Sequence, residues 1–482
     1  MASVFLNDVD DYLAPSQACV NPLYTNGDET PQDEVKPRMR RRKRDAEEIP
    51  AAPASLANTT SSTPTSTTPV QASLADCLAC SGCVTTAETV LLEQHHSLQA
   101  WQKRPRDKPW LVVLSSASAS ADWKLDNSHV LATLLVDLLD VQAVVDGSMA
   151  LQASRHAAAQ AFVQDRSFRL TSACPAFVCW AETTCHDAVP LLQTTPSSLG
   201  GYYYHSSDCH VLHMAPCHDK KLEAARPESQ RHVQMVLTTD ECRQLLEQAL
   251  EDRMVVDGLA DYARSLPLVP RWKGLGWTLA HGPAWITDGG VSKTSDGFFA
   301  VGSGGYADYI FRYACRELYQ FDTPADLPSE AVSSTGSQPR SRRVARSQRD
   351  YRQVALYRHA NGSLSLSPGP ERLLRFGIAY GMATITKVIP EAVQDSSLFD
   401  YIEVMACPSG CINGGGQIAP SGETPSEMRA RLQRSREKYA AEPAGDAWKL
   451  LPMATKPVFH KIPPLQHTRG AVAGVKVEDT RW

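Results

Sequence analysis

The chain has 482 residues and 43% of them are hydrophobic, so it can bury a sizeable core and has room for two domains. Its formal net charge of −5 argues against a dedicated nucleic-acid-binding protein, which is normally basic. The start, MASVFLNDVDDYLAPSQACV, lacks the pattern of a secretory signal, and no apolar run reaches the roughly 18 residues of a membrane span. We therefore expect a soluble intracellular protein, in which 13 cysteines act as ligands or buried thiols rather than disulfides.

The N-terminal part of the chain divides into three predicted segments. Residues 1–25 form a short arm. Residues 26–72 are predicted to be disordered, because a basic run at 36–44 is followed by a tract rich in Ser, Thr, Pro and Ala. The basic run fits a nuclear-import signal and a solvated charged linker equally well. Residues 73–100 form a predicted cluster-binding segment.

That segment carries three cysteines at the spacing C-x2-C-x2-C, Cys77, Cys80 and Cys83. Three thiols with only small residues between them can surround one cluster, and thiolates are the standard ligands of iron–sulfur cubanes. A structural zinc site, the alternative, usually pairs two C-x2-C knuckles. A bacterial ferredoxin would also offer a Cys-Pro shortly afterwards, which is absent here. The missing ligand must come from elsewhere, and Cys19 is the nearest candidate.

From Trp110 onward the pattern becomes α/β. The apolar run at 110–114 is typical of a buried parallel strand. Further strands are predicted at 168–171, 211–214, 233–237 and 399–405, and helices at 128–140, 149–163, from 239 onward, at 306–318 and at 371–389. Strands that alternate with helices indicate α/β layers. We predict an α/β domain over 105–425 with a disordered insertion at 323–350, then a C-terminal helix and mobile tail over 426–482.

One glycine-rich turn precedes the helix predicted at 306–318. Gly302-Ser303-Gly304-Gly305 is similar to a phosphate-binding loop but lacks its Gly-Lys-Ser/Thr ending. We predict a tight turn with close packing.

A second thiol cluster lies near the C-terminal end of the α/β region. Cys407 and Cys411 are separated by Pro-Ser-Gly and followed by Ile-Asn and three glycines. Glycines let backbone N–H groups come close to a sulfide-bearing cluster. Cys174 and Cys217 also follow predicted strands, at the strand ends where such folds place their sites. These two can complete four ligands, although either one alone is more often a buried structural thiol.

The remaining cysteines of the α/β region have no ligand-like context, and we interpret them as packing residues: Cys179, Cys185, Cys209, Cys242 and Cys315. A zinc site made of Cys209, His213 and Cys217 stays open as a weaker alternative.

Taken together, these motifs resemble the iron-only-hydrogenase-like proteins of cytosolic iron–sulfur assembly, the prelamin-A-recognition-factor-like group. The motifs that carry the resemblance are SQAC, LADCLACSGCVT, TSACP, MAPCHDKKLEA, GSGGYADYIFR, RFGIAYG and EVMACPSGCINGGGQ. They cover nearly the whole chain apart from 26–72 and 323–350. The resemblance implies an α/β fold of the iron-only-hydrogenase type, with parallel sheets flanked by helices and a small N-terminal iron–sulfur module.

The resemblance also implies two [4Fe–4S] clusters. Its motifs assign Cys19, Cys77, Cys80 and Cys83 to the first cluster. They assign Cys174, Cys217, Cys407 and Cys411 to the second cluster. In hydrogenases the residue before the first of these second-cluster ligands is a proton-relaying cysteine, whereas here it is Ala173, which has no proton to relay. Lys220 matches a lysine that binds a cyanide of the hydrogenase di-iron unit.

The family is expected to act in assembly rather than in hydrogen chemistry. The implied role is a cytoplasmic factor between the scaffold and the targeting complex, which reaches apo client proteins indirectly and contacts neither membrane nor nucleic acid directly. The alternatives are an active iron-only hydrogenase and a zinc-stabilised nuclear interaction protein that uses the basic run. Trp482 is predicted to dock the targeting complex as an apolar anchor, against the alternative that it packs on the protein's own surface.

Overall fold

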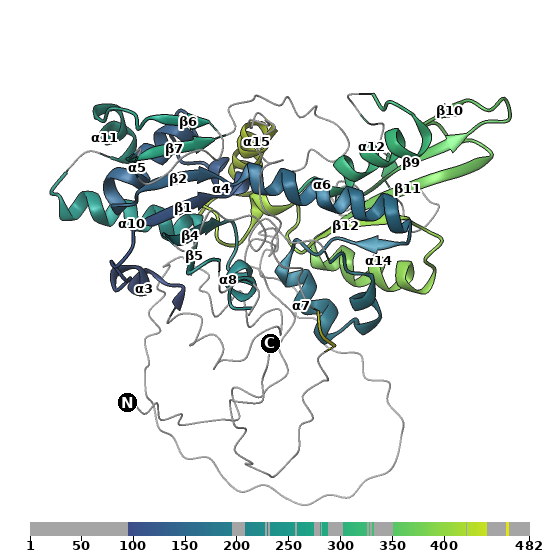
Figure 1. The fold of residues 1–482 in the computed structure, drawn as a ribbon, viewed down its shortest axis with the longest axis horizontal. Coiled ribbons are helices and arrows are strands. Elements are labelled where there is room, and N and C mark those ends of the chain that lie inside the picture. Colours follow the sequence, from purple (N-terminus) through teal and green to yellow (C-terminus); the bar gives the residue numbers. More distant parts are fainter. Residues whose placement is uncertain are drawn as a thin grey trace, which may run out of the picture.

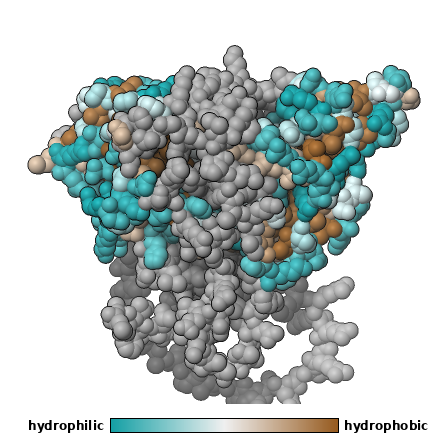
Figure 2. Space-filling model, in the orientation of Figure 1, coloured by the Kyte–Doolittle hydropathy of each residue, from teal (hydrophilic) through white to brown (hydrophobic). Residues whose placement is uncertain are grey.

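The computed structural model describes residues 95–194, 208–226, 229, 232–255, 258–273, 280, 282–287, 302–324, 327, 330–331, 350–420, 422–440 and 459–461. Two β-sheets lie side by side, each covered by helices, and helix α15 (Pro425–Ala440) lies between the two halves (Figure 1). On the face seen in Figure 2, hydrophobic residues are interspersed among hydrophilic ones over both halves.

Sheet A forms the first half, and every neighbouring pair of its strands is parallel. Its strand order is β5 (Met235–Thr238), β4 (His210–Ala215), β1 (Trp110–Leu114), β2 (Ala143–Asp146), β7 (Ala284–Thr287) and β6 (Arg271–Lys273). All five residues of β1 are buried, as the apolar run predicted. A parallel sheet buried on both faces needs helices on each side.

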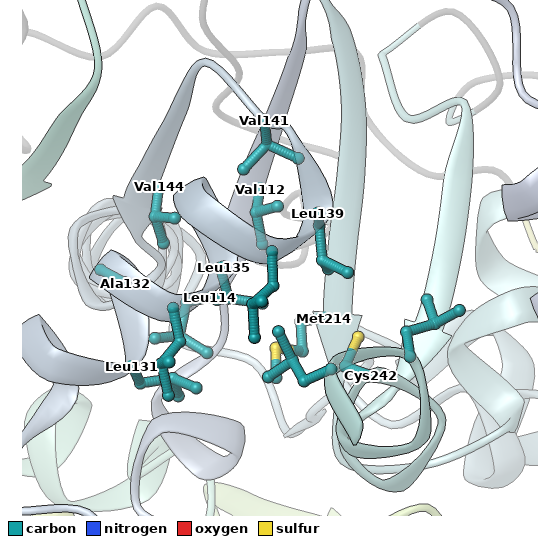
Figure 3. Close-up of a cluster of buried hydrophobic side chains, with 14 of the residues drawn as sticks. Val112, Leu114, Leu131, Ala132, Leu135, Leu139, Val141, Val144, Met214 and Cys242 are labelled. Atoms are coloured by element: carbon teal, nitrogen blue, oxygen red, sulfur yellow. The ribbon is translucent and has the colours of Figure 1, made fainter. Parts of the chain in front are cut away.

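The helices of this half are α3 (Leu98–Gln102), α4 (Ser116–Ala119), α5 (Ser128–Leu139), α8 (Asp219–Ala224), α10 (Thr239–Asp252) and α11 (Leu259–Ser265). Helix α5 confirms the helix predicted at 128–140. Helix α10 begins as predicted, with a capping box in which the Thr238 hydroxyl and the Glu241 carboxylate each accept from the other's backbone N–H. The core between α5, α10 and the sheet is aliphatic, with Leu114, Leu135 and Met214 at its centre (Figure 3).

Sheet B forms the second half and is mixed. Its strand order is β10 (Leu364–Ser365), β9 (Tyr351–Arg358), β11 (Glu371–Tyr380), β12 (Tyr401–Met405) and β3 (Arg169–Leu170), and β8 (Glu330–Ala331) pairs with β9. Strands β11, β12 and β3 are parallel, whereas β9 is antiparallel to β8, β10 and β11. Helices α6 (Ser148–Asp165) and α12 (Tyr306–Tyr319) cover one face. Helices α7 (Pro175–Thr183) and α14 (Met382–Gln394), with the 3-10 turn η3 (His186–Leu191), cover the other.

The sequence prediction for 371–389 was wrong. The segment is not one helix: β11 runs to Tyr380, Gly381 adopts φ +82°, and α14 then begins. The strand is stabilised by pairing with β9 on one side and β12 on the other, which are contacts that helical periodicity does not report. The strand also packs closely against its surroundings: a Cβ at Gly377 would lie 2.9 Å from the Phe399 ring, so a larger residue would not fit there.

The insertion predicted to be disordered at 323–350 also needs correction where it is described. Residues 330–331 form β8, and Leu327 is buried in the core beneath α12. Strand β9, which follows the insertion directly, had no sequence prediction. The final predicted strand and the predicted C-terminal helix are confirmed as β12 and α15.

Candidate metal centre

Four cysteines end up between the two sheets because each follows the carboxyl end of a parallel strand. Cys174 follows β3 and is the residue before α7, Cys217 follows β4, and Cys407 follows β12. Cys411 opens the short 3-10 turn η6 (Cys411–Asn413). Sheet B thus supplies three thiols and sheet A supplies one, at the edges where α/β folds place their sites.

The electrostatics show that these four side chains are close together. Burial raises the pKa of Cys217 well above its ordinary value, and the negative charges of Asp219, Cys407, Cys411 and Cys174 raise it further. Burial also raises the pKa of Cys174, to about 12, with Cys411 as the next cause. The pKa of Cys411 is also raised, with burial as the first cause. Thiols whose pKa lies above its ordinary value need a positive charge nearby before they become thiolates, and a metal cluster supplies it.

The backbone around the thiols is packed too closely for ordinary side chains. A Cβ at Gly414 would lie 2.3 Å from the Pro216 carbonyl oxygen, and a Cβ at Gly416 would lie 2.6 Å from Thr238 Cβ. The Gly416 N–H donates to the Pro216 carbonyl at 3.0 Å. Because these positions are glycines, the backbone of the Cys411 loop packs directly against the backbone of the Cys217 loop. Four cysteine thiols on closely packed, glycine-rich loops fit an iron–sulfur cluster.

One buried cation belongs to the site. The Lys220 ammonium donates to the Ala173 carbonyl at 3.1 Å and to the Glu223 carboxylate at 2.6 Å. Burial by itself lowers the pKa of Lys220, but Glu223 and then Cys217 outweigh it, so the pKa lies above its ordinary value. A permanent positive charge beside the thiols favours their ionised, metal-binding form.

Thr171, three residues before Cys174, belongs to a buried network of hydroxyls and an amide. The Tyr401 hydroxyl donates to Gln193 Oε1 at 2.8 Å and lies 2.7 Å from Thr171 Oγ1. Gln193 Nε2 in turn donates to the Ala158 carbonyl at 2.8 Å. This network orders the start of the Cys174 loop, and burial raises the pKa of Tyr401 well above its ordinary value.

Sequence reasoning missed a second network, beneath Cys411. The Glu403 carboxylate accepts from the backbone N–H groups of Gly305 and Ala307, at 3.0 and 2.8 Å, and from the Tyr380 hydroxyl at 3.0 Å. It thereby ties β12 to the first turn of α12. The Ser303 hydroxyl lies 3.3 Å from Cys411 Sγ. The available signal was an acid in the middle of an otherwise apolar strand, beside a turn that had been predicted only to pack closely.

The nine cysteines in the described part of the chain form no disulfide with one another. Cys179, Cys209, Cys242 and Cys315 are buried and Cys185 is half-buried, which fits the predicted packing roles. Within the described residues, no three His, Cys, Asp or Glu side chains are placed to hold a single metal ion, so Cys209, His213 and Cys217 do not form the alternative zinc site there. A cubane has no such requirement, because each of its thiolates binds a different iron.

The predicted N-terminal ligands Cys19, Cys77, Cys80 and Cys83 lie outside the described residues, as does Trp482. Among the helices that the structure describes, none combines the length and apolarity needed to cross a bilayer.

Two α/β sheets with four half-buried cysteines on the loops between them fit the class of iron-only-hydrogenase-like proteins. The sequence matches the family described as iron only hydrogenase large subunit, C-terminal domain, over residues 116–415. The chain belongs to this family and, within it, to the group whose members are named cytosolic iron–sulfur assembly factors.

Relatives from distant organisms match over nearly their whole length. The cytosolic iron-sulfur assembly component 3 of Mus musculus is 30% identical, with 93% of this chain and 91% of the relative covered. The cytosolic Fe-S cluster assembly factor narfl of Xenopus tropicalis is 28% identical, with 90% and 88% covered. Among solved structures, the apo [FeFe]-hydrogenase HydA1 from Chlamydomonas reinhardtii superimposes with a TM-score of 0.50 at 18% identity, covering 76% of this chain and 98% of that one. The structural likeness establishes the fold.

Proposed function

We propose that this protein is a cytoplasmic iron–sulfur assembly factor that holds two [4Fe–4S] clusters and acts between the scaffold and the targeting complex. The observation that carries the proposal is the four-thiol centre between the two sheets, in a chain whose full-length relatives are named cytosolic assembly factors. Cys174, Cys217, Cys407 and Cys411 are the proposed ligands of one cluster. Bound there, a cubane supplies positive charge and a one-electron redox centre.

The test of the cofactor is iron and acid-labile sulfide counting on anaerobically purified protein, together with its EPR spectrum. Two [4Fe–4S] clusters per chain are expected. Cys411→Ser is expected to lower the iron content and the soluble yield, because the cluster joins segments distant in sequence and its binding adds to folding stability. Cys185→Ser is the matched control, since this half-buried thiol lies in the same half but outside the centre. Zinc in place of iron, or full iron in Cys411→Ser, would contradict the proposal.

The second proposed cluster is bound by Cys19, Cys77, Cys80 and Cys83. Its ligands flank the long segment 26–72, so the closing of that loop carries an entropic cost, and this cluster should be the more labile. Cys80→Ala is expected to remove it and leave the Cys411-bound cluster in place. Equal iron loss from both sites would refute this modular arrangement.

No hydrogen chemistry is proposed for the chain. In the hydrogenase-like motif, Ala173 occupies the position of the proton-relaying cysteine, and its methyl group has no proton to transfer. The protein with verified cluster content is expected to evolve no hydrogen, and Ala173→Cys alone should not create that activity. Hydrogen evolution by the unmodified protein would overturn the assignment.

The proposed partners are the scaffold and targeting-complex proteins, with apo client proteins reached indirectly. Trp482 is the proposed contact with the targeting complex, through its large, stiff apolar side chain. Trp482→Ala is expected to weaken recovery of that complex in a pull-down and to leave cluster content unchanged. Equal recovery by both forms would refute the role of Trp482 without affecting the cluster assignment.

A further inference from the structure

The Ser303 hydroxyl is a side-chain group outside the ligand set that lies within hydrogen-bond distance of a sulfur of the centre. Its Oγ lies 3.3 Å from Cys411 Sγ, and the residue is 2% exposed. It belongs to the turn before α12, whereas Cys411 belongs to the loop after β12. The two residues are 108 positions apart, so the contact is made by the tertiary fold.

The backbone holds Ser303 rigidly in this position. The carbonyl of Gly302, a residue with φ +83°, accepts from the Ile412 N–H at 3.0 Å. The Tyr439 hydroxyl of α15 donates to the Ser303 carbonyl. A Cβ at Gly410 would lie 2.8 Å from Ser303 Cβ, so the two loops touch directly. The Gly305 and Ala307 N–H groups donate to the Glu403 carboxylate and so fix the far end of the turn.

The direction of the hydrogen bond follows from the charge of the acceptor. The single Ser303 hydroxyl proton has two acceptors in reach, Cys411 Sγ at 3.3 Å and the Tyr380 oxygen, which gives its own proton to Glu403 and so can only accept from Ser303. A metal-bound Cys411 is a thiolate, and a hydrogen bond to an ionised acceptor is the stronger kind. With a cluster bound, Ser303 therefore donates to Cys411 Sγ rather than to Tyr380.

The geometry points to Ser303 as a positioning residue that donates a hydrogen bond to the Cys411 sulfur and raises the reduction potential of the cluster held there. This inference rests on the proposed [4Fe–4S] centre. A hydrogen bond to a ligand sulfur stabilises negative charge, and the reduced cluster carries one more negative charge than the oxidised cluster. The bond therefore favours the reduced form and makes the potential less negative.

The experiment is a redox titration of anaerobic protein followed by EPR, with iron counted in every sample. Ser303→Ala should keep its iron and shift the reduction equilibrium roughly tenfold toward the oxidised form, a fall of about 59 mV for a one-electron couple. An exchangeable proton coupled to the cluster, seen by ENDOR in H2O against D2O, should disappear in the same variant. Ser303→Gly, in a turn already rich in glycine, is the second variant and should behave alike.

Ser116→Ala is the matched control. Ser116 is buried in α4, which packs against η6, and within the described residues its hydroxyl has no hydrogen-bond partner. This change should leave the potential unaltered. An unaltered potential in Ser303→Ala with full iron would overturn the inference and leave the proposed function standing. Loss of iron from both Ser303 variants would make Ser303 structural and also overturn it. Absence of a cubane from the unmodified protein would instead refute the proposed function.

Discussion

The two halves of the molecule are stabilised by different kinds of interior. The core of sheet A is mostly aliphatic, although it includes Trp101, Trp110, Trp123 and Trp285, and Leu114, Leu134 and Leu135 are completely buried in it. Sheet B buries aromatic rings, with Phe376 in contact with Phe162, Phe311 and Tyr401. It also buries polar groups, since Glu403 is completely inaccessible and hydrogen-bonded three times.

The difference between the two interiors matches the origin of the four cysteines of the centre. Sheet A provides only Cys217, and the helix that follows it buries Lys220 and Lys221 in ion pairs with Glu223 and Glu241. Sheet B provides three thiols, and its buried hydrogen-bond networks end on the loops that carry them. Apolar contacts stabilise without fixing direction, whereas hydrogen bonds fix distance and angle. The aliphatic half should therefore determine stability, and the polar half should determine cluster geometry.

The strongest test of this comparison removes the single thiol that links the halves. Cys217→Ser should lose the cluster between the sheets and, with it, the stabilisation that binding adds to the folded state. The expected result is loss of that site's iron and a large fall in the free energy of unfolding of the anaerobic protein. Urea unfolding with iron counting measures both. Iron retained at that site in Cys217→Ser would mean that sheet B can hold the cluster alone.

The next test removes the charge of the polar network. Burial raises the pKa of Glu403, while hydrogen bonds from Ala307, Tyr380 and Gly305 oppose that rise. Glu403→Gln replaces one acceptor oxygen by an amide N–H2 group, which faces backbone N–H donors that need an acceptor. The free energy of unfolding should fall by about 3 kcal/mol, because hydrogen bonds to charged groups contribute about 1.5–3 kcal/mol each. It should also lower iron content. Glu371→Gln, at an exposed acid on β11, is the control.

An apolar substitution in the sheet A half should change the stability of the protein without changing its iron content. Leu135→Ala in α5 empties part of the sheet A core and should cost about 2–5 kcal/mol. Iron per folded molecule and the EPR spectrum should stay unchanged, because no hydrogen bond of the centre is touched. An altered spectrum in Leu135→Ala would show that the aliphatic half also determines cluster geometry.

The smallest expected effect is the pH dependence that one histidine at the edge of sheet A contributes. Burial, with the Lys221 charge as the next cause, lowers the pKa of His96 to about 3, and its Nδ1 accepts from the Val236 N–H at 3.1 Å. The unfolded chain therefore takes up a proton below its ordinary pKa of 6.5 that the folded chain does not. Stability should fall as the pH falls through this window, by up to about 1.4 kcal/mol per pH unit from this residue.

His96→Gln should flatten that slope, because the amide can accept the same backbone hydrogen bond without titrating. Chemical unfolding at pH 7 and pH 5.5 measures the difference between the two proteins. The same slope in both would show that His96 does not contribute.

The sequence by itself determined the chemistry of this protein and much of its local structure. Local patterns were sufficient for these predictions. They are the spacing of Cys407 and Cys411, the glycines after them and the apolar run at 110–114, and each can be interpreted from the chemistry of its own residues. The helix predicted at 371–389 failed because β11 is stabilised by β9 and β12, and pairing between distant strands leaves no trace in local periodicity.

Only the tertiary structure decided how the site is assembled. Cys174, Cys217 and Cys411 come together because parallel strands of two separate sheets end at the same place. Ser303 and Glu403 acquired their roles only when the turn before α12 was placed against β12 and the Cys411 loop. Ligand types are a property of the residues themselves, whereas hydrogen bonds to those ligands depend on atoms that the fold brings within about 3 Å of one another.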